Sequence, residues 1–263
     1  SKPITNYGYK DMQKIPYNGF WRKFPVNRNF PEMAGRKVVA YFDFDNRNDN
    51  ELVVKVALSS TSSEGAVKNL RAEAAGKTFE TIASEASSLW NSHLSSIEVE
   101  GNEDQKAMFY TSYYHTLINP SVYMDVDGSY RGVDGNIHKA DGFVNYTVFS
   151  LWDTYRAEHP FLMLMKPREA RDMVVSMLKH QKQSVHGLLP IWSHMANDNW
   201  CMSGYHATSV LADAITKGAD VNIEEALGAM IETSNVPYLE GLGEYVNYGY
   251  VPFDVSTTAA STT

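Results

Sequence analysis

The chain has 263 residues, of which 43% are hydrophobic and 12% aromatic, and its formal net charge is -8. The length is enough for one large or two ordinary domains with a real core, and the charged fraction of 21% argues against a disordered acidic tail. The negative net charge and the lack of Lys/Arg clusters argue against nucleic acid or an anionic membrane as a partner.

The first 60 residues carry the pattern of β-strands. Apolar and polar side chains alternate over residues 38–45 and again over residues 51–58. The turn-rich sequence NRNDN lies between these two runs, which is typical of a hairpin. We therefore predict that residues 1–60 are β-structure.

Three helical runs follow. In residues 61–74, a Ser/Thr-rich cap precedes apolar side chains that recur at helical spacing. Residues 79–94 and 103–115 show the same spacing, and the latter run begins with acidic residues, which favour a helix N-terminus. We expect three consecutive helices.

A Gly- and Asp-rich segment, residues 120–138, is predicted to form short strands and turns. It contains the sequence MDVDG, which resembles the start of a calcium-binding EF-hand loop. Counted from Asp125, such a loop requires Gly at position six and Glu at position twelve, whereas Gly128 is fourth and Asn136 is twelfth. We therefore predict an Asp-Gly turn and no EF-hand.

Long helices joined by loops are predicted for the second half of the chain. Pro167 suits the first position of a helix whose apolar stripe ends before the sequence HGLLP. A further helix is expected from Ser203 until Gly218, with His206 on its apolar face, and Asn222 then caps another.

Three of the loops, at residues 150–156, 187–192 and 198–207, hold the residues of unusual type. Alternate connections of antiparallel helix pairs emerge at the same end, so loops two helices apart can form one pocket. In such a pocket, carboxylates and Arg bind vicinal hydroxyls, and Trp covers the face of a sugar ring. We predict a carbohydrate site from Asp153, Trp152, Arg156 and Trp192, followed by a helix that opens at Pro160.

Simpler roles remain open for these residues. Asp153 and Arg156 are three apart and could pair with each other as a helix-start ion pair. His206 could be a satisfied core residue. Cys201 is the only cysteine, so it forms no intrachain disulfide; it could be a small buried hydrophobe or, with His206 as base, a nucleophile.

The chain shows no sign of membrane insertion or of natural termini. No run approaches the ~20 apolar residues of a spanning helix, and the start, SKPITNYGYK, has no signal-peptide core. The last residues, STTAASTT, are an unusual natural end. We therefore expect no membrane insertion and a chain that is a fragment or a mature piece of a longer protein.

Several motifs, in this order, resemble glycoside hydrolase family 92, the calcium-dependent exo-acting α-mannosidases. The likeness covers essentially the whole chain, and it is the combination of SLWDTYR with the later motifs that is specific. The motifs are ALSSTSSEGAVKNLRAE (57–73), FYTSYYH (109–115), DVDGSYRG (125–132), FSLWDTYRAEHP (149–160), GLLPIW (187–192), CMSGYH (201–206) and LADAITKG (211–218).

The resemblance implies an α+β multidomain fold. Members of the family have an N-terminal β-sandwich, linking helices and a large (α/α)6 toroid, with the active site between sandwich and toroid. By that likeness, residues 1–60 are the last strands of the sandwich, residues 61–118 are the linking helices, and residues 119–263 are the opening part of an incomplete toroid.

The activity implied is hydrolysis of terminal α-mannosides of glycans with inversion, of the α-1,2 type. The family uses a carboxylic acid, a carboxylate base and a calcium ion near the mannose. These groups come from later parts of the toroid, including a Gly-Asn-Asp-rich motif that this sequence lacks. We therefore assign no acid, base or metal ligand here, and expect the chain alone to be inactive.

The resemblance also implies partners and a location. Mannose-containing glycans and the missing C-terminal portion of the same enzyme are the expected partners, and the expected location is periplasmic or extracellular. Asp153 with Trp152, together with Cys201, carries over to the sugar subsite, whereas Arg156, Trp192 and His206 match motif positions without an assigned role.

Two other functions remain open. The chain could be a non-catalytic carbohydrate-binding or scaffold protein of the same fold. It could also be a different toroid enzyme, such as a glycoside phosphorylase, although no basic cluster offers a phosphate site.

Overall fold

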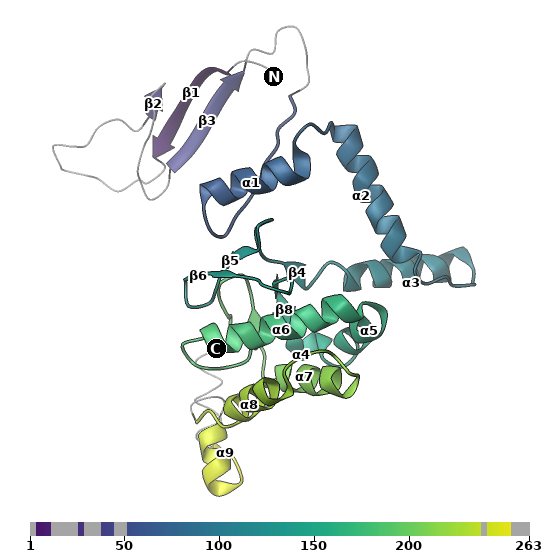
Figure 1. Cartoon of the computed structure of the whole chain (residues 1–263), viewed down its shortest axis with the longest axis vertical. Coiled ribbons are helices and arrows are strands. Elements are labelled where there is room, and N and C mark those ends of the chain that lie inside the picture. Colours follow the sequence, from purple (N-terminus) through teal and green to yellow (C-terminus); the bar gives the residue numbers. More distant parts are fainter. Residues whose placement is uncertain (1–3, 12–25, 29–37, 45–51, 238–240, 254–263) are drawn as a thin grey trace, which may run out of the picture. The chain divides into compact units, whose positions relative to one another are not determined.

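A computed structural model describes residues 4–11, 26–28, 38–44, 52–237 and 241–253 (Figure 1). The chain divides into two compact units, Ser1–Lys55 and Val56–Thr263. The described residues of the first unit form an antiparallel sheet in the order β2-β1-β3, with β1 at Ile4–Asp11, β2 at Val26–Arg28 and β3 at Val38–Phe44.

The strand predicted at 38–45 is confirmed as β3, but its predicted hairpin partner is wrong. β3 pairs with β1, in a register that runs from Ile4 opposite Phe44 to Asp11 opposite Val38. Residues 52–58 form no strand, and residues 45–51, which include the predicted turn, lie outside the described residues. Alternation identifies an extended segment but does not supply its partner strand, and most of the apolar side chains of 52–58 are exposed.

The second unit begins with the three predicted helices, all confirmed: α1 at Ser63–Ala74, α2 at Phe79–Leu94 and α3 at Glu103–Thr116. Each starts at a side-chain cap. The hydroxyl oxygens of Ser62 and Thr78 each accept a hydrogen bond from the backbone amide three residues ahead, at 3.0 and 3.2 Å. Before α3, Asn102 and Gln105 form a reciprocal capping box.

Three pairs of short antiparallel strands follow, and three of their strands, β4, β5 and β6, lie in the Gly/Asp-rich segment in which short strands were predicted. β4 (Ser121–Val122) pairs with β7 (Tyr146–Thr147), β5 (Ser129–Arg131) with β6 (Ile137–Lys139), and β8 (Phe149–Ser150) with β9 (Trp192–Ser193). The predicted Asp-Gly turn is confirmed, because the amide of Gly128 donates to the carbonyl of Asp125 at 2.8 Å and Gly128 has φ 81.

The side chain of Asp125 is buried and ties this turn to the start of the unit. It accepts hydrogen bonds from Ser59, Thr61 and Asn69 at 2.8, 2.6 and 2.8 Å. Burial raises the pKa of Asp125, but these hydrogen bonds together lower it below its ordinary value. The carboxylate thus fixes the segment before α1, α1 itself and the turn against one another.

The remaining helices are α4 at Leu151–Thr154, α5 at Glu158–Met165, α6 at Pro167–Gln183, α7 at Ala207–Thr216, α8 at Ile223–Ser234 and α9 at Leu242–Tyr248. Helices α4 to α8 supply residues of the main core, whereas α9 has no buried residue. Helices α6, α7 and α8 lie side by side (Figure 1). Apolar side chains from α5 to α8 fill the space between them, among them Leu162, Met177, Leu211, Ala214 and Ala226.

Two predicted helix starts differ from the structure. Pro160 is the third residue of α5 rather than the first, which is tolerated because an amide is dispensable anywhere in the first turn. Helix α7 begins at Ala207 and not at Ser203, so His206 occupies its N-cap and not its apolar face. Positive φ at Met202 and Gly204 keeps the preceding residues out of the helix.

The second unit is helix-rich with small sheets, consistent with an α/α-type domain. The β-sandwich, the toroid and the predicted boundaries at residues 60 and 118 stay predictions. Within the described residues, no helix is long and apolar enough to cross a membrane.

Candidate functional site

The first of the three predicted loops contacts the other two. Strands β8 and β9 pair Phe149 with Ser193 and Ser150 with Trp192, which places the start of the first loop against the end of the second. The rings of Tyr155 and His206 are stacked, with centroids 4.2 Å apart and planes inclined by 7°. The first loop therefore also contacts the end of the third.

The second and third loops are joined by the carboxylate of Asp198. It accepts hydrogen bonds from the backbone amides of Ile191, Trp192 and Trp200, at 2.9, 3.1 and 3.0 Å. The three loops, which are far apart in sequence, thus form one assembly, as the argument from antiparallel helix pairs predicted.

Backbone strain is concentrated in this assembly. Among the described residues, the non-glycine residues with positive φ are Val148, Met195, Trp200 and Met202, at 65, 54, 54 and 67. Such conformations cost about 1–3 kcal/mol each and persist only where the surrounding structure enforces them, often at ligand sites. All four lie in the loops or immediately beside them, which favours these loops as the functional site.

Asp153 lies on α4 with an exposed side chain, and it accepts one hydrogen bond, from Ser150 Oγ at 2.6 Å. Arg156 is also exposed, and its guanidinium carbon lies 5.4 Å from the ring centroid of Tyr155. The ion pairs of the described residues do not include one between Asp153 and Arg156, so the structure does not support that simpler role. A carboxylate with one donor can accept further hydrogen bonds from a hydroxylated ligand.

The other predicted residues are partly accessible. Trp152 is 40% exposed, and Trp192, Cys201 and His206 are half-buried. The structure brings the loops together but does not join the predicted side chains: within the described residues, no hydrogen bond, ion pair or ring contact links any two of the six. His206 is at a helix cap and Cys201 is not fully buried, so neither fits its proposed core role.

Two titratable residues on α5 were not singled out by sequence reasoning. Burial, with a smaller contribution from the charge of Asp153, raises the pKa of Glu158 to about 7. Burial lowers the pKa of His159 to about 4, and its Nε2 has no hydrogen-bond partner. Both lie in the motif FSLWDTYRAEHP, but no pattern of residues there indicates that Glu158 is partly buried and His159 fully buried.

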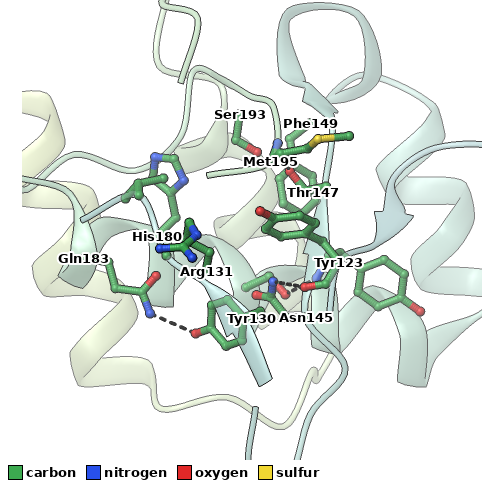
Figure 2. Close-up of a pocket in the computed structure, with 14 residues that line it drawn as sticks. Tyr123, Tyr130, Arg131, Asn145, Thr147, Phe149, His180, Gln183, Ser193 and Met195 are labelled. Carbon is green, nitrogen blue, oxygen red and sulfur yellow. Dashed lines mark hydrogen bonds between the residues drawn. The ribbon is translucent and has the colours of Figure 1, made fainter. Parts of the chain in front are cut away.

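A cavity of about 20 Å³ lies beside the β8–β9 pair (Figure 2). Phe149 and Ser193 of that pair line it, together with Met195 and His180. This volume holds about one water molecule and is too small for a sugar ring. A sugar that binds the loops would instead contact their exposed side, where Trp152 and Asp153 lie.

The described residues do not form a metal site. No group of three or more His, Cys, Asp or Glu side chains among them could hold a metal ion. Calcium is bound by six to eight oxygen ligands, usually with several carboxylates. The residues described here therefore do not fit the calcium ion that the resemblance implies.

Comparisons with known proteins agree on one family. The family model for the glycosyl hydrolase family 92 catalytic domain matches residues 65–263. No match was found among curated proteins.

Two solved structures resemble the chain over most of its length. The family GH92 alpha-mannosidase BT3965 from Bacteroides thetaiotaomicron, in complex with mannoimidazole, has a TM-score of 0.77 and 37% identity, covering 97% of this chain and 33% of that one. The family GH92 inverting mannosidase BT2199 from Bacteroides thetaiotaomicron VPI-5482 has a TM-score of 0.78 and 28% identity, covering 96% of this chain and 34% of that one. The chain thus spans about a third of the length of these relatives.

Proposed function

Because the chain belongs to glycosyl hydrolase family 92, we propose that it is part of an exo-acting α-mannosidase that hydrolyses terminal α-mannosides of glycans with inversion. In this proposal the segment supplies sugar-binding residues. Its partners are mannose-containing glycans and the remaining portion of the same enzyme. Two relatives of known structure are described as an alpha-mannosidase and an inverting mannosidase, which supports the proposed reaction.

The observation that carries the proposal is the convergence of the three loops. They present one carboxylate with spare acceptor capacity, Asp153, next to an accessible indole, Trp152. A carboxylate accepts hydrogen bonds from sugar hydroxyls, and an aromatic face packs against the C–H surface of the ring. Trp192 and His206 lie on the loops that contact this corner, through the β8–β9 pair and through Tyr155.

Inverting hydrolysis needs two carboxyl groups on opposite sides of the glycosidic bond. One protonates the leaving oxygen and the other activates a water molecule. The proposal assigns neither group, nor a calcium ligand, to this segment. Asp153 is a binding carboxylate that orients the sugar, and the segment by itself is proposed to bind mannose without cleaving it.

Three finer points belong to the proposal and rest on the family alone. The expected linkage is α-1,2. The calcium ion is expected to be held by residues outside this segment. The expected location is periplasmic or extracellular.

The proposal is tested by measuring mannose binding and α-mannoside cleavage with this chain and with a longer chain that carries its natural flanking sequence. The chain alone should bind mannose without turnover, and the longer chain should cleave α-mannosides until a calcium chelator is added. Cleavage by the short chain would contradict the view that the reacting carboxyls lie elsewhere. Binding without cleavage by both chains would favour a carbohydrate-binding or scaffold protein, and cleavage that requires phosphate would favour a phosphorylase.

A further inference from the structure

One side chain, the carboxylate of Asp198, determines how the second and third loops are held together. Its Oδ2 accepts from the amide of Ile191, and its Oδ1 accepts from the amides of Trp192 and Trp200. The donors come from both sides of the turn that separates the two loops. Hydrogen bonds to an ionised acceptor are shorter and stronger than those between neutral groups, so a single carboxylate can fix both strands of this turn.

The carboxylate is itself held by the core. Only 10% of the Asp198 side chain is exposed, and its Oδ2 lies 3.5 Å from Nε2 of His180. His180 projects from α6, the helix whose other face packs in the main core, and it borders the cavity shown with Ser193 and Met195 in Figure 2. The contact between Asp198 and His180 therefore holds the two loops in a fixed position against α6.

His180 does not offset the negative charge of Asp198 with a positive charge of its own. Burial lowers the pKa of His180, and the charge of Asp198 only partly opposes this effect. The ring is then neutral near pH 7. The three backbone amides are accordingly the hydrogen-bond donors that stabilise the buried carboxylate most directly.

Of the three amides that Asp198 holds, one belongs to Trp192 of the proposed sugar site, and another belongs to Trp200, which directly precedes Cys201 of that site. Trp192 pairs with Ser150, the residue that donates to Asp153. Trp200 has φ 54, a conformation that an L-residue adopts only when it is enforced, and Cys201 follows it directly. We propose that Asp198 is a positioning residue, which orients Trp192 and the Trp200–Cys201 step for sugar binding. This inference rests on the proposed function.

The test replaces Asp198 by Asn in the whole chain, which keeps the size of the side chain and removes its charge and one acceptor. We call the three hydrogen bonds from backbone amides to Asp198 the clamp. Hydrogen exchange of the amides of residues 191, 192 and 200 measures whether the clamp is intact, and tryptophan fluorescence during a mannose titration measures binding. We expect exchange of these amides to become faster and mannose affinity to fall, each by about tenfold.

Two control variants separate positioning from general stability. Asp213→Asn removes a partly exposed carboxylate of α7 that pairs with Lys217, and it should change neither exchange nor affinity. Asp125→Asn breaks a buried network around α1 whose hydrogen-bond partners, Ser59, Thr61 and Asn69, lie outside the three loops, and it should lower the melting temperature while affinity changes by less than about twofold.

Each outcome decides between the claims. If the three amides exchange at an unchanged rate in Asp198→Asn, the claim that Asp198 forms the clamp is wrong. Faster exchange with unchanged mannose affinity, or an equal loss of affinity in Asp125→Asn, would overturn the role in binding. If the unmodified chain binds no mannose, the proposed function fails, whereas the clamp is still decided by the exchange measurement.

Discussion

The imidazole ring of His206 lies almost parallel to the phenol ring of Tyr155, with the two centroids 4.2 Å apart. Helices α5 and α6 lie between the two residues in sequence, and the stack joins the loop that carries Asp153 to the loop that carries Cys201. Gly204 lies directly beside the His206 ring, since a Cβ at that position would be 2.9 Å from Nε2. The stack is therefore enclosed on one side by the backbone of its own loop.

Removal of this stack should weaken the site more than the fold. His206→Ala is expected to cost about 1 kcal/mol of coupling between the loops, the usual size of an aromatic pair, and to lower mannose affinity several-fold. His206→Phe keeps a flat ring and should retain most of both. Urea denaturation and a mannose titration of the two variants check this, and equal affinity in His206→Ala and the unmodified chain would contradict it.

The packing around Asp125 leaves no space for a larger residue at position 65. A Cβ on Gly65 would lie 2.5 Å from Asp125 Oδ2 and 2.6 Å from Ser59 Oγ. Gly65→Ala should therefore destabilise the chain by about 1–3 kcal/mol. Gly228, in the middle of α8, has open space around its Cα, so Gly228→Ala should stabilise by about 0.5–1 kcal/mol. Thermal unfolding of both variants tests whether the two changes in stability have opposite signs.

The partly buried carboxyl of Glu158 should cost stability at alkaline pH. Its pKa is raised from 4.5 to about 7 by burial and by Asp153, so the folded state binds a proton that the unfolded state has released. The favourable contribution of the protonated form is complete below pH 4.5 and is lost as pH rises through 7. Because the group is partly solvated, Glu158→Gln should stabilise by roughly 1–2 kcal/mol at pH 8 and by little at pH 4.5.

Urea denaturation at the two pH values checks this prediction, with the exposed Glu73→Gln as the matched control. In addition, Asp153→Asn should lower the pKa of Glu158 in a titration followed by NMR, because it removes a nearby negative charge. A Glu158 pKa that ignores this substitution would show that the two carboxyls do not interact.

His159 should make the fold sensitive to acid, so its effect on stability has the opposite pH dependence to that of Glu158. Burial lowers its pKa from 6.5 to about 4, and Nε2 has no partner, so protonation is disfavoured in the folded state. The stability present above pH 6.5 is lost as pH falls through 4, by about 3 kcal/mol at most. His159→Phe should remove this loss, whereas His115→Phe, at an exposed position, should keep it; the slope of stability between pH 7 and 4.5 measures the difference.

Features coded by neighbouring residues were predictable from the sequence. Ser62, Asn102 and Asn222 cap helices through oxygens that reach amides three residues ahead, so spacing alone locates the start of each helix. The pairing of β3 with β1 was not predictable, because alternation says nothing about which extended segment supplies the partner.

For the site too, local features were predictable and tertiary ones were not. The three loops that meet were predicted from their residue types and from the order of the helices. The role of Asp198 was missed because its partners are backbone amides, which have no sequence signal. The predicted position of His206 was wrong because Met202 and Gly204 adopt left-handed conformations that delay the start of α7, and a left-handed methionine has no signal in the sequence.

The central claim is that Asp153 is a sugar-binding carboxylate, and a mannose titration of Asp153→Ala tests it most directly. The side chain is exposed and has one protein donor, Ser150, so its removal should leave the melting temperature within about 2 °C while mannose affinity falls by about tenfold or more. Ser150→Ala, which removes only that donor, should reduce affinity less. If Asp153→Ala lowers stability and leaves mannose binding intact, Asp153 is a structural residue and the proposed site is wrong.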